Sequence, residues 1–140
     1  MGLAAGLRAT VRHVVTEADT AIQAGSGDVP VLGTPRLLAL AEAACVAALE
    51  PHLDPGMTSV GTRVALEHRR ASPVGAEIEV EAELTELAGR RLVFAFIARH
   101  LSPTAQNPGQ DEELVAGAGS VERIVVDRDK FLARAALRPG

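Results

Sequence analysis

The chain has 140 residues, of which 47% are hydrophobic and 23% charged, a composition typical of a soluble globular protein and not of a disordered one. Its net charge is −4, and its only aromatic residues are three phenylalanines. A mildly acidic chain with no dense basic run and so few rings for base stacking is a poor candidate for binding nucleic acid.

The length suits a single domain, which we expect to span residues 1–140. The lone cysteine, Cys45, cannot form an intrachain disulfide, and its apolar neighbours favour a core position over a nucleophile. A free thiol is typical of a reducing cytosol, so we expect a cytoplasmic protein. We find no segment that could span a membrane and no signal peptide in residues 1–8, and we expect no membrane partner.

The first half of the chain predicts a strand, a loop and a helix start. A weak alternation over residues 11–15 indicates a short strand, and residues 24–33 are rich in glycine and proline, as in a loop. Thr34 and Pro35 then resemble a helix start, with Thr34 as the N-cap and Pro35 at the first helical position.

Residues 36–50 are apolar almost all round, which predicts a long helix that is buried on every side. Pro51 ends it, because the residue before a proline is pushed out of helical geometry. A turn follows at residues 54–56.

The second half predicts four strands. Over residues 77–84, apolar side chains alternate with glutamates, which indicates a half-buried strand with an acidic outer face. A tight hairpin at residues 88–90 leads into the next strand, and a polar loop lies between residues 100 and 114. The four strands are expected at residues 60–70, 77–84, 91–100 and 115–126, with a closing helix at 128–137.

This order predicts an α+β hot-dog fold, in which an antiparallel sheet wraps around one long apolar helix. One helix covers only part of such a sheet, and the apolar edges that remain favour a second copy of the chain. We therefore expect a homodimer.

Glu42 is the most informative polar residue, because helical spacing places it on one face with Leu38 and Cys45 inside the apolar segment. A carboxylate there is costly unless it has a partner or lies at a cavity, so Glu42 is a candidate for chemistry. The alternative is that it points to solvent at a gap in the packing or at a dimer interface.

His68 ends the apolar face of the first of the four strands, where a histidine is either structural or an acid–base group. The other histidines, His13, His52 and His100, are expected at the surface or in loops. No histidine, cysteine and acid have the spacing of metal ligands, so we expect no metal. The motifs GxxxxGK[ST], GxGxxG and GxSxG do not occur, which argues against ATP, dinucleotide and α/β-hydrolase chemistry.

Residues 31–135 resemble the hot-dog thioesterases similar to fluoroacetyl-CoA thioesterase, and the resemblance is densest at residues 40–46, 51–56, 59–62 and 86–92. In that family a threonine at the start of the central helix, a glutamate within it and a histidine on the following strand form the catalytic set. Thr34, Glu42 and His68 have the same spacing, and Gly61 matches a glycine whose N–H faces the thioester oxygen.

The resemblance implies a thioester hydrolase for a short or small acyl-CoA. Glu42 would be the nucleophile or the base that activates water, Thr34 would position it or join the attack, and His68 would act as acid and base. The Gly61 N–H would stabilise the oxyanion. Whether Glu42 or Thr34 bonds to the acyl group stays open.

Substrate binding is assigned to Gly33, to Arg69 and above all to Arg123, which matches the family's late strand. Coenzyme A enters as part of the substrate, and no other cofactor is expected. The segment 29–33 has no aromatic residue, whereas the fluoroacetyl enzyme has phenylalanines there, so we expect a different acyl group.

Two other functions fit a hot-dog domain. The main alternative is a non-catalytic module that binds acyl-CoA as a sensor or carrier. A dehydratase is the third, but its Asp/His arrangement near an Asn-Pro element is not seen.

Overall fold

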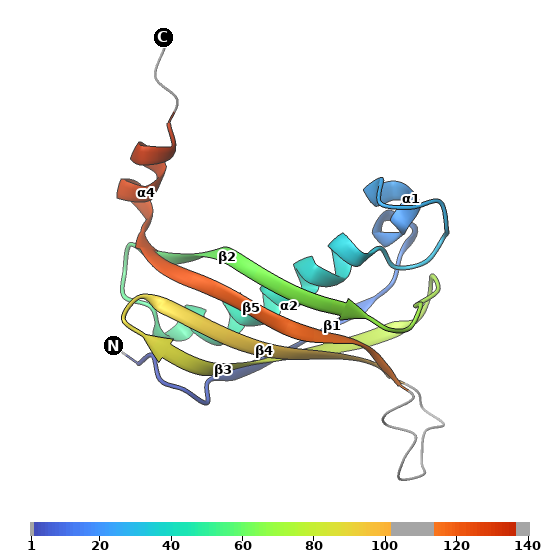
Figure 1. Ribbon diagram of the computed structural model, residues 1–140, viewed down its shortest axis with the longest axis horizontal. Coiled ribbons are helices and arrows are strands. Elements are labelled where there is room, and N and C mark those ends of the chain that lie inside the picture. The colour runs from blue at the N-terminus through green and yellow to red at the C-terminus, as the bar shows by residue number, and fades with distance from the viewer. Residues whose placement is uncertain (1, 102–113, 137–140) are drawn as a thin grey trace.

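The computed structural model describes residues 2–101 and 114–136, so the predicted loop between residues 100 and 114 lies almost wholly outside the described residues. One antiparallel sheet has the strand order β1-β3-β4-β5-β2 (Figure 1). Its strands are β1 Arg8–Val14, β2 Met57–His68, β3 Glu77–Ala88, β4 Arg91–His100 and β5 Val115–Asp127.

A long helix, α2 (Thr34–Leu49), lies against one face of this sheet, and Figure 1 shows it beside the strands. Two short turns of helix precede it, and a 3-10 turn and a final helix follow elsewhere in the chain. Their bounds are η1 Glu17–Asp19, α1 Ala21–Ala24, η2 Glu50–His52 and α4 Arg128–Ala135. The predicted arrangement of sheet and central helix is confirmed.

The alternating sequence pattern of strand β3 corresponds to an alternation of buried and outward-facing side chains in the structure. The apolar side chains of Ile78, Val80, Ala82 and Leu84 are fully buried under α2, whereas the alternating glutamates face outward. Two of those glutamates pair with β1, because Arg8 contacts Glu83 and Arg12 contacts Glu79, each at 3.1 Å. The neighbouring edge strand thus neutralises part of the acidic face.

Helix α2 is buried on one face only, so the prediction of burial on every side is wrong for the single chain. The buried face consists of Leu37, Leu40, Ala41, Ala44, Cys45, Ala48 and Leu49. The opposite face is also apolar but exposed, and consists of Ala39, Ala43, Val46 and Ala47. One sheet covers only one side of a helix, which leaves this second apolar face uncovered.

The start of α2 also differs from the prediction. Gly33 is the N-cap, with extended backbone angles, and its carbonyl accepts hydrogen bonds from the backbone N–H groups of Arg36 and Leu37 at 3.0 Å each. Thr34 is therefore the first helical residue and not the cap. Pro35 follows it within the first turn, where a missing N–H still costs nothing. The Thr34 hydroxyl is consequently not used for capping.

Among the described residues, strand β2 lies at one edge of the sheet and pairs with β5 alone. Its register shifts from Gly61 opposite Arg123 to Arg63 opposite Glu122, so Thr62 has no partner in the ladder. A bulge of this kind bends a strand and re-aims its side chains. Here it lies beneath Glu42 of α2, which is the residue of greatest chemical interest.

Candidate active site

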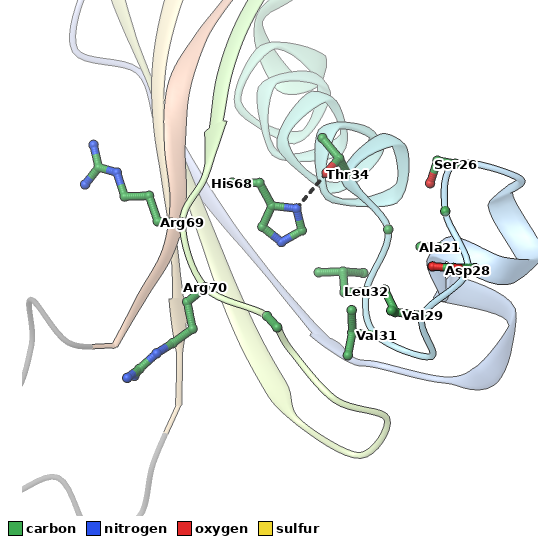
Figure 2. A pocket seen from close by; sticks show the side chains of 13 residues that line it. Ala21, Ser26, Asp28, Val29, Val31, Leu32, Thr34, His68, Arg69 and Arg70 are labelled. Atoms are coloured by element: carbon green, nitrogen blue, oxygen red, sulfur yellow. Dashed lines mark hydrogen bonds between the residues drawn. The ribbon is translucent and has the colours of Figure 1, made fainter.

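Thr34 and His68 form the first cluster of predicted site residues. The Thr34 hydroxyl lies 2.8 Å from Nδ1 of His68, and Figure 2 shows the imidazole turned from β2 toward the start of α2. The other ring nitrogen, Nε2, is buried and has no hydrogen-bond partner within the described part of the chain. A buried polar atom without a partner is costly, so Nε2 is available to a group that completes the site.

Burial lowers the pKa of His68 below its ordinary value, because the charged imidazolium is poorly solvated there. The ring is therefore neutral around pH 7. A neutral imidazole hydrogen-bonded to a hydroxyl can accept and return a proton, which is the requirement for a general acid–base group.

An open pocket of about 350 Å³ lies beside the Thr34–His68 pair. Its wall comes from the segment before α2, and Figure 2 shows Val29, Val31 and Leu32 on this side. None of the described residues that line it is aromatic. The pocket therefore offers small aliphatic surface beside polar side chains such as Ser26 and Asp28.

The second cluster centres on Glu42 and Arg123. Nη1 of Arg123 donates to Oε2 of Glu42 over 2.9 Å. The guanidinium also donates to the hydroxyl and to the carbonyl oxygen of Ser59, each at 2.9 Å. Arg123 is thus held by three hydrogen bonds in a fixed orientation, and it fixes the Glu42 carboxylate in turn.

Gly61 lies directly against this carboxylate. A Cβ atom built at Gly61 would be 2.5 Å from Oε2 of Glu42, which is closer than real Cβ atoms approach. Only glycine lets Glu42 come so near to the β2 backbone. The bulge, the glycine and Arg123 together place the carboxylate on the edge strand.

The structure does not bring the two clusters together within one chain. Thr34 and Glu42 are eight residues apart on α2, roughly 12 Å along the helix axis. Gly61 and His68 are seven residues apart on β2, roughly 23 Å along the strand. No hydrogen bond joins one cluster to the other among residues 2–101 and 114–136.

The remaining predicted residues have different surroundings. Gly33 is buried and donates its N–H to the Asp19 carbonyl at 2.9 Å. Arg69 follows His68, but its guanidinium points to the other side of β2 (Figure 2) and pairs with Glu67 at 3.0 Å. Arg69 is nevertheless among the residues that line the pocket beside Thr34, so its role in substrate binding stays a prediction.

Asp19 is a residue that the sequence did not single out. Its buried carboxylate accepts hydrogen bonds from Arg36 and His13, each at 2.7 Å, and from the backbone and hydroxyl of Thr16. Burial alone would raise the pKa of this carboxyl, but these donors outweigh it and hold the pKa far below its usual range. Because the Asp19 carbonyl also holds Gly33, the network positions the start of α2 and hence Thr34.

Two histidines expected at the surface or in loops are half-buried and hydrogen-bonded, so that expectation is wrong for them. His13 bonds to Asp19, and Nε2 of His100 lies 2.5 Å from the Ser72 hydroxyl. Burial and the charge of Arg70 lower the pKa of His100. Since the Ser72 carbonyl accepts from Leu32 N–H, His100 helps to hold the segment before α2.

Cys45 is fully buried, as predicted, and burial raises the pKa of its thiol to about 12. The thiol is therefore protonated and no nucleophile at neutral pH. Within the described ranges no group of histidine, cysteine and acidic side chains could hold a metal ion. The helices of this part of the chain are also too short or too polar to cross a membrane.

The chain is similar to known thioesterases. Residues 15–129 match the model of the family described as fluoroacetyl-CoA-specific thioesterase. A fluoroacetyl-CoA thioesterase from Streptantibioticus cattleyicolor is 35% identical over 125 residues, which cover 89% of this chain and 79% of the relative.

Solved structures give the same result. A fluoroacetyl-CoA thioesterase structure superposes with a TM-score of 0.82 and 31% identity, and covers 96% of both chains. A mutant of the fluoroacetyl-CoA-specific thioesterase in complex with fluoroacetate and CoA has a TM-score of 0.78 and 31% identity over 92% of this chain and 99% of its own. A Thermus thermophilus member of the thioesterase superfamily, 21% identical with a TM-score of 0.80 over 96% of this chain and 93% of its own, supports the hot-dog fold alone.

Proposed function

The chain belongs to the fluoroacetyl-CoA-specific thioesterase family, and from this premise we propose that it hydrolyses a short or small acyl-CoA with Thr34, Glu42 and His68. The observation that carries the proposal is the hydrogen bond of 2.8 Å between Thr34 and a neutral, half-buried His68. The hydroxyl is free for this contact because Gly33 caps the helix.

The side chains supply what thioester hydrolysis requires. Glu42 accepts a proton from the attacking water as the new carbon–oxygen bond forms at the thioester carbon. The Gly61 N–H stabilises the negative charge on the carbonyl oxygen. The carbon–sulfur bond then breaks, and the neutral His68, hydrogen-bonded to Thr34, takes up the proton that Glu42 holds and passes it to the leaving sulfur, so that both groups return to their starting protonation states. The products are the carboxylic acid and free coenzyme A.

A homodimer brings the two clusters into one site. The edge of β2 is unpaired and the exposed face of α2 is apolar, so these neighbouring surfaces suit a second copy of the chain. A two-fold axis reverses the direction of β2 in the partner. Glu42 then approaches the partner subunit's His68. The roughly 12 Å between Thr34 and Glu42 along one helix therefore no longer keeps the two kinds of cluster apart.

The acyl group is small and aliphatic. The pocket beside Thr34 is walled by Val29, Val31 and Leu32, and no described aromatic side chain closes it. We therefore place an unfluorinated short acyl chain there. The reaction needs only acyl-CoA and water, so no further cofactor takes part, and the buried thiol of Cys45 suits a reducing cytoplasm.

The test is hydrolysis of a panel of acyl-CoAs by the purified full chain, followed as released thiol. Acetyl-, propionyl-, isobutyryl- and fluoroacetyl-CoA cover size and fluorination separately. We expect turnover of at least one short acyl-CoA, with no preference for the fluorinated one over acetyl. Tight binding of acyl-CoA with no turnover of any member would replace the enzyme by a sensor or carrier module.

A further inference from the structure

Most basic side chains of this acidic protein have an acidic partner. Ion pairs link arginines of β1, α2, β2, β4 and β5 to nearby carboxylates. Within residues 2–101 and 114–136, the basic side chains for which no such partner is found are Arg90, Arg99, Arg128, Lys130 and Arg134. All of these except Arg99 lie at the end of the sheet where β2 begins and α4 stands (Figure 1).

These cations surround a hollow of about 170 Å³ between α4 and the β3–β4 turn. We call it the basic hollow, and its lining is Met57, Arg90, Val126, Asp127, Lys130, Phe131 and Arg134. Lys130 and Arg134 are four residues apart on one helix, so their charges repel each other unless an anion lies between them. The Asp127 carboxylate does not fill that role, since it caps α4 by accepting from Lys130 N–H at 3.0 Å.

Phe131 adds a flat apolar surface to this cluster of charge. It is one of three phenylalanines in the chain, and it is 38% exposed, whereas Phe94 and Phe96 lie in the core. An exposed ring among unpaired cations matches a ligand that combines a planar base with several phosphates.

A second hollow of about 330 Å³ lies next to the basic hollow and shares Met57 with it. Its lining also includes Ser59, Arg128 and the acidic residues Glu50 and Asp54. Ser59 is the residue that holds Arg123 and through it Glu42. Met57 and Gly61 are four residues apart on β2, roughly 13 Å, a length that an extended pantetheine arm spans.

We propose that the basic hollow binds the phosphorylated adenosine end of coenzyme A, a site that rests on the proposed thioesterase function. The phosphates contact Arg90, Lys130 and Arg134, and the adenine lies against Phe131. The pantetheine arm runs through the second hollow past Ser59, and the thioester reaches Gly61 and Glu42 of the same chain. The Thr34–His68 pair of that chain is out of reach, because Met57 and His68 are eleven residues apart on β2, roughly 36 Å.

The experiment compares substrates with and without the nucleotide. We expect the double variant Lys130→Ala/Arg134→Ala to raise KM for an acyl-CoA by about tenfold through loss of two charged contacts, with kcat unchanged. KM for the matching acyl-pantetheine should stay the same. Arg90→Ala, on a different element, should give the same pattern to a smaller extent, so the test does not depend on α4 alone. Arg99→Ala removes an equally unpaired cation from the other end of β4 and should change nothing.

Binding of free coenzyme A, measured by calorimetry, separates this proposal from the proposed function. The wild-type chain could hydrolyse no thioester but bind coenzyme A, and lose that binding in the double variant. This result would support the nucleotide site and contradict the proposed thioesterase function. If acyl-CoA and acyl-pantetheine are affected equally, or neither is affected, the hollow is not the nucleotide site. A KM change confined to thioesters carried on an acidic carrier protein would also overturn it.

Discussion

Nη1 of Arg123 donates to the Glu42 carboxylate over 2.9 Å, but the two side chains differ in exposure: 7% for Arg123 and 34% for Glu42. The cation is thus the buried partner and the carboxylate the accessible one. A buried charge left without its partner is strongly destabilising, whereas an exposed one regains hydration. The pair is arranged so that a fixed arginine presents a reachable carboxylate.

Replacement of Glu42 should therefore separate activity from stability. Glu42→Ala leaves Arg123 buried with Ser59 alone and should lower the free energy of unfolding by about 3 kcal/mol. Glu42→Gln keeps an oxygen that accepts the hydrogen bond and should cost about 1 kcal/mol, yet both variants should lose about 100-fold or more in kcat. Thiol release and urea unfolding measure the two effects, and undiminished turnover in Glu42→Gln would remove Glu42 from the catalytic set.

Gly61→Ala should displace the Glu42 carboxylate, because the added Cβ would lie 2.5 Å from Oε2. We expect kcat to fall by about 100-fold and the free energy of unfolding to fall by about 1–3 kcal/mol. A double-mutant cycle gives the control. In a Glu42→Ala background the clash is gone, so Gly61→Ala should have nearly no effect on stability. An equal loss in both backgrounds would mean that Gly61 acts through the β2 backbone alone.

Thr34→Ala tests whether the hydroxyl serves His68 or the helix. Loss of a true N-cap costs about 1 kcal/mol, but Gly33 occupies that position. We therefore expect the unfolding midpoint of Thr34→Ala to stay close to that of the wild type while kcat falls, and Thr34→Ser to retain most of the activity. If Thr34→Ala lowered the free energy of unfolding by about 1 kcal/mol, as loss of an N-cap does, and left turnover normal, Thr34 would have a structural role.

The pH profile should report the lowered pKa of His68. Activity requires the neutral ring, so kcat/KM should stay level as the pH falls toward about 6.5, the ordinary histidine pKa, and should decline only below it.

Stability should follow the same sign. Unfolded His68 binds a proton near pH 6.5 while folded His68 resists it, so the free energy of unfolding falls as the pH drops through that window. His100 is shifted in the same direction, and the comparison with His68→Gln isolates the part due to His68. In the activity profile, a decline of kcat/KM that begins well above pH 6.5 as the pH is lowered would contradict the assignment of His68 as the acid–base group.

Local pattern was sufficient for much of the fold, because its signals lie within single elements. The alternating glutamates of β3 and the apolar run of α2 each predict an element from neighbouring residues alone. The N-cap was misplaced by one residue, since a threonine before a proline satisfies the cap preference and only the backbone angles of Gly33 decide the position.

The site was predictable only in part. The positions of Glu42 on the helix and of His68 on the strand made both candidates, and the resemblance to the thioesterase family joined them in one set. The contact between Glu42 and Arg123, however, joins residues 81 positions apart. The hydrogen bonds of Asp19 likewise link β1, η1 and α2, so no local pattern marks it. The second apolar face of α2 looks the same in sequence whether a sheet or another subunit covers it.

A matched pair of valine substitutions tests the homodimer. Val64 is 43% exposed on β2, the edge that we assign to the dimer, and Val14 is 51% exposed on β1, the opposite edge. The wild-type chain should sediment at twice 14.6 kDa. Val64→Glu buries a charge in the interface, so the mass should shift to that of the monomer. Because Glu42 then loses the partner subunit's His68, kcat should also fall. Val14→Glu should stay dimeric and active, since its edge faces solvent. A wild-type monomer with full activity would show that one chain assembles the site alone, and would overturn the shared arrangement.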